Sequence, residues 1–240
     1  MAIRYPLKRR RPLKRRRRIF RRRKKRYSTA RRKYEAPQYI RLYSNPLVIN
    51  SGGSMVMQSV FPMGTGQTSR LSNRTAVTGI MVRVASAVMA NLVTATLQEL
   101  QELVIHNWFI LDKAPTGNDI PGPSIIFDGV SPWNYSVEHD RKKRFSVLKK
   151  WHTKLTTGGT WTANSSCQVL PRSVTGKSFM WRPKKPVITY WKNNATANYS
   201  DVESNALLWV MIVSSSIPQQ TAANCTCNIY YDNTVYFKCL

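Results

Sequence analysis

The sequence predicts an all-β fold: a single antiparallel jelly-roll sandwich of eight strands, preceded by a disordered, basic N-terminal arm. Two patterns support this prediction. Apolar and β-branched residues recur in runs of strand length, separated by clusters of Gly, Pro, Asn and Asp. Half of the Lys and Arg residues lie before residue 34. Seven or eight strands over about 190 residues, with long loops and no long amphipathic helix, favour the jelly roll among the sandwiches.

The N-terminal segment, residues 1–33, carries 19 of the 38 Lys and Arg residues, and the first acidic residue is Glu35. Mutual repulsion among these charges, together with Pro6 and Pro12, opposes a stable free fold. The other 207 residues carry 19 basic and 11 acidic residues and most of the aromatic side chains, so they can build a packed core. The formal net charge of +27 indicates a polyanionic partner and argues against an ordinary metabolic enzyme.

We expect the arm to bind phosphates without regard to base sequence and to act as a nuclear localisation signal. Tyr5, Phe20 and Tyr27 lie among the charges, where they can stack on unpaired bases. A merely solubilising tail is the weaker alternative, because so dense a charge of one sign is unfavourable without a counterion. The arm residues predicted to contact nucleic acid are Arg9, Arg10, Arg11, Lys14, Arg15, Arg16, Arg17, Arg18, Arg21, Arg22, Arg23, Lys24, Lys25, Arg26, Arg31, Arg32 and Lys33.

After the arm, residues 34–75 are expected to form a connector that leads into a first strand at about Met55–Phe61, and residues 76–240 the jelly-roll domain. A short helix is expected at Thr94–Leu103, where the spacing of apolar residues is helical. Clusters rich in Gly, Pro and Asn predict turns. The expected strands are Ile80–Ala85, Leu103–Leu111, Phe145–Leu155, Pro186–Trp191, Ala206–Ser214 and Asn224–Lys238, the last with a turn at Asp232-Asn233. The expected turns are Ala114–Asp119, Pro121–Pro123, Thr157–Gly159 and Lys192–Asn194.

A second basic cluster, Arg141, Lys142, Lys143 and Arg144, is also predicted to contact the nucleic acid. Two interpretations remain open: a solvated sheet edge, where lysine discourages edge-to-edge pairing, or a surface that extends the phosphate contacts of the arm. Further basic residues follow at Lys149, Lys150, Lys154, Arg172, Lys177, Arg182, Lys184 and Lys185. The nearby Trp151, Trp181 and Trp191 are expected in the core or at a subunit interface rather than as base-stacking platforms.

No catalytic constellation emerges from the sequence. Gly176-Lys177-Ser178 resembles the end of a P-loop, but Pro171 stands where the motif needs its first glycine and would remove a backbone N–H donor. Glu138-His139-Asp140 places acid and base together, but adjacent residues on a strand point to opposite faces, and no nucleophile motif accompanies them. We therefore expect no enzymatic activity.

The four cysteines and three histidines lack the paired spacing of a zinc site, so neither a metal nor another cofactor is expected. No hydrophobic run follows the N-terminal charges, and thus no signal peptide is predicted. The longest apolar stretch, Ala206–Val213, is too short to span a bilayer, so no membrane insertion is expected.

Five segments resemble the coat protein of geminiviruses, plant viruses with small circular single-stranded DNA. Together they span roughly residues 105–240, in the order and spacing of that family. The N-terminal third matches in character only, and residues 34–75 lack the Cys and His of the finger-like segment that many members carry there. The segments are Asn107–Lys113 followed by Pro115–Gly117, Ile125–Asp128, Asp140–His152, Glu203–Met211 and Asn228–Asn233.

The resemblance implies a single jelly roll and a small, twinned icosahedral shell that packages circular single-stranded DNA in the virion. It also implies import into the host nucleus, with further copies of the chain, nuclear import receptors and insect vector proteins as partners. The basic arm alone predicts only polyanion binding and would accept RNA equally. The alternative is a nucleic-acid-binding protein without a shell, either a viral nuclear-shuttle or movement protein or a chromatin-type protein.

Overall fold

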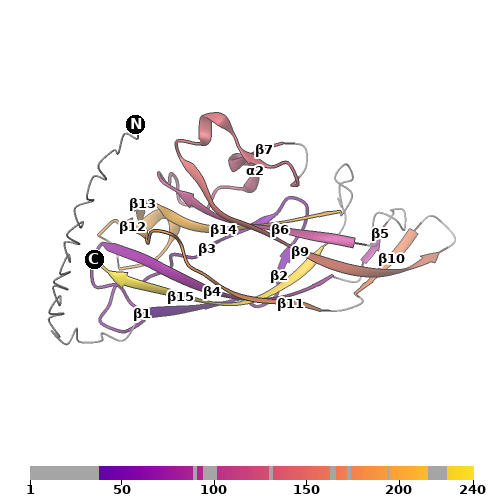
Figure 1. Ribbon diagram of the computed structural model, residues 1–240, viewed down its shortest axis with the longest axis horizontal. Helices are drawn as coiled ribbons and strands as arrows, with labels where there is room; N and C mark the ends of the chain where they lie inside the picture. Colours follow the sequence, from indigo (N-terminus) through magenta and orange to yellow (C-terminus); the bar gives the residue numbers. More distant parts are fainter. Residues whose placement is uncertain are drawn as a thin grey trace, which may run out of the picture. The chain divides into compact units, whose positions relative to one another are not determined.

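The computed structural model describes residues 38–88, 91–93, 102–129, 132–162, 166–171, 174–193, 195–215 and 226–240. The segment Ala36–Leu240 forms one compact unit (Figure 1). The basic arm and most of the expected helix Thr94–Leu103 lie outside the described residues, while Leu103 itself belongs to a strand.

Two antiparallel sheets form the unit (Figure 1). Strands in the first sheet are β1 (Gln38–Tyr43), β15 (Cys227–Cys239), β4 (Arg74–Val88), β12 (Val187–Trp191) and β13 (Val202–Ser204), with β11 (Thr175–Trp181) on β4 and β2 (Leu47–Ile49) on β15. The second sheet contains β3 (Ser54–Met57), β14 (Ala206–Ser215), β6 (Glu102–Asp112), β9 (Phe145–Thr162), β10 (Ser166–Pro171) and β5 (Asn91–Val93). Shorter elements are α2 (Pro123–Ile126), the pair β7 (Phe127–Asp128) and β8 (Ser136–Val137), and the 3-10 turns η1 (His139–Arg141) and η2 (Tyr199–Asp201).

Eight of the strands pair in the order of a jelly roll. In chain order these strands are β1, β3, β4, β6, β9, β11, β14 and β15. One sheet joins the first, eighth, third and sixth of them, and the other joins the second, seventh, fourth and fifth. Every pair is antiparallel. This order is that of two interlocked Greek keys, which confirms the predicted fold class.

The core between the sheets is rich in aromatic rings. Phe109 of β6 lies with its ring centroid 4.8 Å from those of both Trp151 and Trp181, and 6.4 Å from that of Trp209. Trp191 is also almost fully buried and contacts Phe61 edge-on, with the ring centroids 6.2 Å apart. The prediction that these tryptophans belong to the core is therefore confirmed.

A second apolar cluster covers the outer face of the second sheet. There Trp108 and Ile110 of β6 and Ile212 of β14 pack beneath Phe127 and Val137. The ring centroids of Trp108 and Phe127 lie 4.8 Å apart. Because β6 and β14 are thereby buried on both faces, their sequences are nearly continuous apolar runs rather than alternating ones.

The structure corrects the predicted start of the sandwich. The first strand is β1, inside the expected connector, and it pairs along its whole length with β15. Its residues alternate strictly, with Ile40 and Leu42 packed against the core and Tyr39, Arg41 and Tyr43 exposed. A six-residue edge strand next to a Gly- and Ser-rich segment gives a weak sequence signal, which is why it was missed.

Two expected turns are wrong. β15 continues as a strand through Asp232-Asn233, because both residues pair with β1, and the buried Asn233 side chain lies where the pairing with β4 is interrupted. Its Oδ1 accepts the N–H of Arg83 at 3.4 Å, and its Nδ2 donates to Oε1 of Gln58 at 3.0 Å. The second, Thr157–Gly159, lies within β9, where pairing with β10 keeps the glycine backbone extended.

Candidate nucleic-acid interface

The predicted basic cluster 141–144 does not act as one patch. The guanidinium of Arg144 forms a two-pronged ion pair with Asp112, with Nε to Oδ1 at 2.9 Å and Nη2 to Oδ2 at 2.8 Å. The carboxylate of Asp112 is fully buried, and the Tyr199 hydroxyl donates to its Oδ2 at 2.5 Å. Burial, and then the hydrogen bond to Asp112, raise the pKa of Tyr199, so the hydroxyl keeps its proton. Arg144 therefore neutralises a buried charge.

Arg141 also has partners within the fold. Its Nε lies 2.5 Å from a carboxylate oxygen of Glu138. Its Nη1 donates to the carbonyl oxygen of Ser124 at 3.1 Å and to that of Ile125, which ties the α2 turn to η1. In contrast, both lysines between the two arginines are exposed. Lys142 and Lys143 are thus the exposed cations of the cluster, and nucleic-acid contact by residues 141–144 stays a prediction.

The other basic residues also divide into exposed side chains and side chains that are hydrogen-bonded within the fold. Lys150 and Lys154 are exposed on the outer side of β9, and the Lys150 ammonium lies 5.5 Å from the ring centroid of Trp108. Lys177 donates to the carbonyl oxygen of His152 at 3.1 Å, a contact between the two sheets. Arg182, Lys184, Lys185 and Lys149 are exposed, and Arg172 lies outside the described residues.

Sequence reasoning missed a second surface, on the outer face of the first sheet. We call it the tyrosine–arginine face and define it by Tyr39, Arg41, Tyr43, Arg83, Tyr230, Asp232 and Tyr236. Tyr43, Tyr230 and Tyr39 are the most exposed aromatic side chains of the described chain, at 76%, 45% and 42%. The period-two alternation of Tyr, Arg and Tyr in the first strand was the signal that could have found it.

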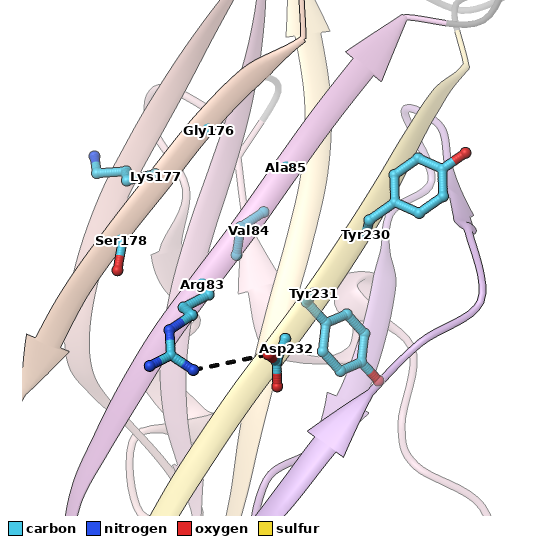
Figure 2. A pocket seen from close by; sticks show the side chains of 9 residues that line it. All are labelled: Arg83, Val84, Ala85, Gly176, Lys177, Ser178, Tyr230, Tyr231 and Asp232. Carbon is cyan, nitrogen blue, oxygen red and sulfur yellow. Dashed lines mark ion pairs between the residues drawn. The ribbon is translucent and has the colours of Figure 1, made fainter.

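An open groove of about 510 Å³ crosses this face between β11, β4 and β15 (Figure 2). Small residues, Ala85 and Gly176, pair at its floor. The Asp232 carboxylate lies 2.5 Å from Nε of Arg41 and 3.7 Å from Nη1 of Arg83, and these contacts, the hydrogen bond from Arg41 first, lower its pKa. The carboxylate therefore stays ionised and holds two exposed guanidinium groups over the sheet.

A buried histidine lies on the opposite sheet. Nε2 of His106 is 2.9 Å from Oγ of Ser214, and its ring contacts Trp133 edge-on. Burial, followed by the charges of Lys150 and His152, lowers the pKa of His106 to about 4. The ring is therefore neutral at physiological pH and belongs to the packing of the sheet rather than to a charged surface.

Neither a phosphate loop nor a metal cluster appears in the described part of the chain. Gly176-Lys177-Ser178 lies within β11, in extended backbone that cannot wrap around a phosphate. His139 begins η1, and the neighbouring Glu138 is paired with Arg141. Among the described residues no three His, Cys, Asp or Glu side chains gather as metal ligands, and no helix there is long and apolar enough to cross a membrane.

The strand order and the packed interior first indicate a class of protein. Double Greek-key sandwiches occur mainly in viral capsid proteins, lectins and cupins. The space between the sheets is here filled by aromatic rings, whereas a cupin binds its ligand inside the fold. A jelly roll with a packed interior and basic residues concentrated outside it fits the capsid class best.

The chain belongs to a family described as the geminivirus coat protein/nuclear export factor BR1 family, whose model matches residues 2–236. The capsid protein of tobacco yellow dwarf virus (strain Australia) is 28% identical over 180 residues, covering 68% of this chain and 65% of that protein. The capsid protein of beet curly top virus (strain California/Logan) is 26% identical over 242 residues, covering 86% of this chain and 90% of the relative. The family and these names together support a viral capsid function.

Among solved structures, the VP2 subviral particle of infectious bursal disease virus aligns with a TM-score of 0.24 and 6% identity. The alignment covers 86% of this chain and 42% of that one. A likeness this distant adds nothing to the argument from strand order.

Proposed function

We propose that the chain is a coat protein that assembles with further copies of itself into a closed icosahedral shell, twinned in form, around circular single-stranded DNA. The observation that carries the proposal is that one chain of this family combines a jelly-roll domain with a strongly basic N-terminal segment. The described residues build a jelly roll, and the N-terminal residues 1–33 carry half of all the Lys and Arg residues. A shell subunit needs both a rigid wall and a polyanion-binding segment.

The charge count supports packaging of a whole genome rather than recognition of a short site. A closed icosahedral shell uses on the order of sixty subunits or more, so arms of 19 cations would supply about 1,100 positive charges. Lys and Arg contacts to phosphate are sufficient, because packaging must accept every base sequence. A flexible single strand can follow many arms, which a stiff duplex cannot do as easily.

The same charges would couple assembly to the genome. Without nucleic acid, clustered arms repel one another, so DNA binding and subunit association should depend on each other and on salt. The arm would also serve as the nuclear localisation signal read by host import receptors. The protein would then occur in the virion and in the host nucleus, with insect vector proteins as further partners.

A second candidate is a nuclear shuttle protein that carries DNA without enclosing it. The family description favours keeping it, since it names a nuclear export factor beside the coat protein. Both candidates bind single-stranded DNA, and therefore DNA affinity does not separate them. Particle formation does.

The test compares the full chain with a variant lacking residues 1–33, each with and without circular single-stranded DNA, by negative-stain electron microscopy. We expect closed particles from the full chain with DNA, and empty or absent particles from the truncated variant. A variant with Lys142 and Lys143 changed to Ala is the matched control, because it removes exposed cations from the sandwich while the arm remains. Soluble monomers under every condition, with DNA binding retained, would overturn the shell and favour the shuttle protein.

A further inference from the structure

We propose that the tyrosine–arginine face binds single-stranded nucleic acid by stacking unpaired bases on its tyrosines, as a second contact beyond the arm. The proposal rests on the proposed function, since it names how part of the sandwich would hold the packaged strand. It assigns base stacking to folded residues, in addition to the phosphate contacts and the stacking by Tyr5, Phe20 and Tyr27 that are expected of the arm.

The aromatic side chains are placed for stacking. Tyr43, Tyr230 and Tyr39 are the most exposed aromatic side chains of the described chain, and all three lie on this face. Tyr39 and Tyr43 point the same way from β1 and stand about 13 Å apart along the strand. Tyr39 lies opposite Tyr236, with the ring centroids 6.4 Å apart, and the exposed ring of Tyr230 stands beside the groove (Figure 2).

The charges on the face suit a phosphate backbone. Arg41 and Arg83, with side chains 65% and 53% exposed, share the single carboxylate of Asp232. Two guanidinium groups against one carboxylate leave a net positive surface, and exposed ion pairs contribute little stability, so these arginines can also bind a phosphate.

The strand β1, which carries Tyr39, Arg41 and Tyr43, follows the arm closely in the sequence, since Lys33, the last arm cation, precedes it by five residues. On the outer side of the other sheet, the cluster around Trp108 and Phe127 covers β6 and β14, while Lys150 and Lys154 of β9 remain exposed.

A second copy of the chain is the other conceivable occupant, and the charges argue against it. In a symmetric pair each face meets its own copy, so the excess guanidinium groups would oppose one another. A polyanion that carries aromatic bases complements both the charges and the rings. We therefore commit to nucleic acid and leave self-association as an outcome of the test.

The test measures the affinity of the full chain for two single strands of equal length, oligothymidylate and its abasic analogue, by fluorescence anisotropy at fixed salt. The first variant changes Tyr39, Tyr43 and Tyr230 to Ala, and the matched control changes the same three to Phe, which keeps the rings. The wild type should prefer oligothymidylate by at least tenfold, because each stacked base adds affinity. The Ala variant should lose most of that preference and keep only the part that Tyr5, Phe20 and Tyr27 of the arm supply, with an unchanged salt slope and unchanged affinity for the abasic strand. The Phe variant should retain the full preference.

Two results would overturn the proposal. An Ala variant that prefers the base-bearing strand as strongly as the wild type would show that these tyrosines do not stack bases. Loss of subunit association in sedimentation, with the base preference intact, would make the face an interface between copies. Failure of the proposed function has a different signature: particles would be absent for the wild type as well.

Discussion

Replacing Arg144 by Met should destabilise the sandwich strongly and leave nucleic-acid binding nearly unchanged. The substitution removes both hydrogen bonds to Asp112, whose carboxylate has no exposed surface, together with the guanidinium carbon that lies 4.7 Å from the ring centroid of Phe145. Breaking a buried ion pair costs about 3–5 kcal/mol, because the remaining charge is left without its partner. The Arg144 side chain is 26% exposed and Tyr199 still donates to the carboxylate, so we expect about 3 kcal/mol.

The assay is urea unfolding of dissociated subunits, with Arg141→Met as the matched control. Arg141 belongs to the same basic cluster, but its ion pair with Glu138 joins side chains that are 39% and 37% exposed. Its replacement should cost about 1 kcal/mol or less. A further change of Asp112 to Asn should recover much of the loss caused by Arg144→Met, because it removes the buried charge.

The salt dependence of DNA binding gives an independent check. Arg144→Met should leave the slope of log affinity against log salt unchanged, whereas replacing Lys142 and Lys143 by Ala should lower it by about 1–2 units. If Arg144→Met lowers the slope and leaves the unfolding free energy intact, the residue contacts DNA and the assignment to the buried network is refuted.

Three further predictions follow from single features. His106 has a pKa of about 4 in the fold and an ordinary value near 6.5 in the unfolded chain. The contribution of the neutral ring to the free energy of unfolding is therefore present above pH 6.5 and is lost as the pH falls toward 4. We expect a loss of about 3 kcal/mol across that window in urea melts, and His106→Gln should flatten this pH dependence. Replacing Arg15–Arg18 by Ala should weaken binding about equally for all DNA sequences and lower the salt slope by about 3; an unchanged slope would contradict phosphate binding by the arm. Asn233→Ala should cost about 1–3 kcal/mol, because it leaves the buried amide of Gln58 without its partner, and an unchanged unfolding midpoint would rule this out.

Local patterns carried most of the fold prediction. The strands around Ile80, Leu103 and Ala206 were visible as alternating or continuous apolar runs, because burial on one or both faces of a sheet selects residue types directly. Turn chemistry was less reliable. Asp232-Asn233 is a turn sequence that the structure keeps within a strand, because both residues pair with β1 and the Asn233 side chain accepts a hydrogen bond from β4 where the pairing with that strand is interrupted.

The candidate site, in contrast to the fold, could not be predicted from local sequence patterns. Arg144 looked like one of four equivalent surface cations, yet its partners Asp112 and Tyr199 lie 32 and 55 residues away in sequence. No local pattern reveals that pairing. Tyr39 and Tyr230 likewise share one surface only because β1 and β15, the first and last described strands along the chain, are neighbours in the sheet.

The sequence by itself determined the all-β class, the aromatic core and the separation of a basic arm from a folded domain. Those properties depend on composition and on the period of neighbouring residues, which any stretch of chain displays. Only the tertiary structure decided which cations neutralise buried carboxylates and which remain exposed, and which tyrosines share a face. Those properties depend on strand order and register, which bring together residues that are distant along the chain.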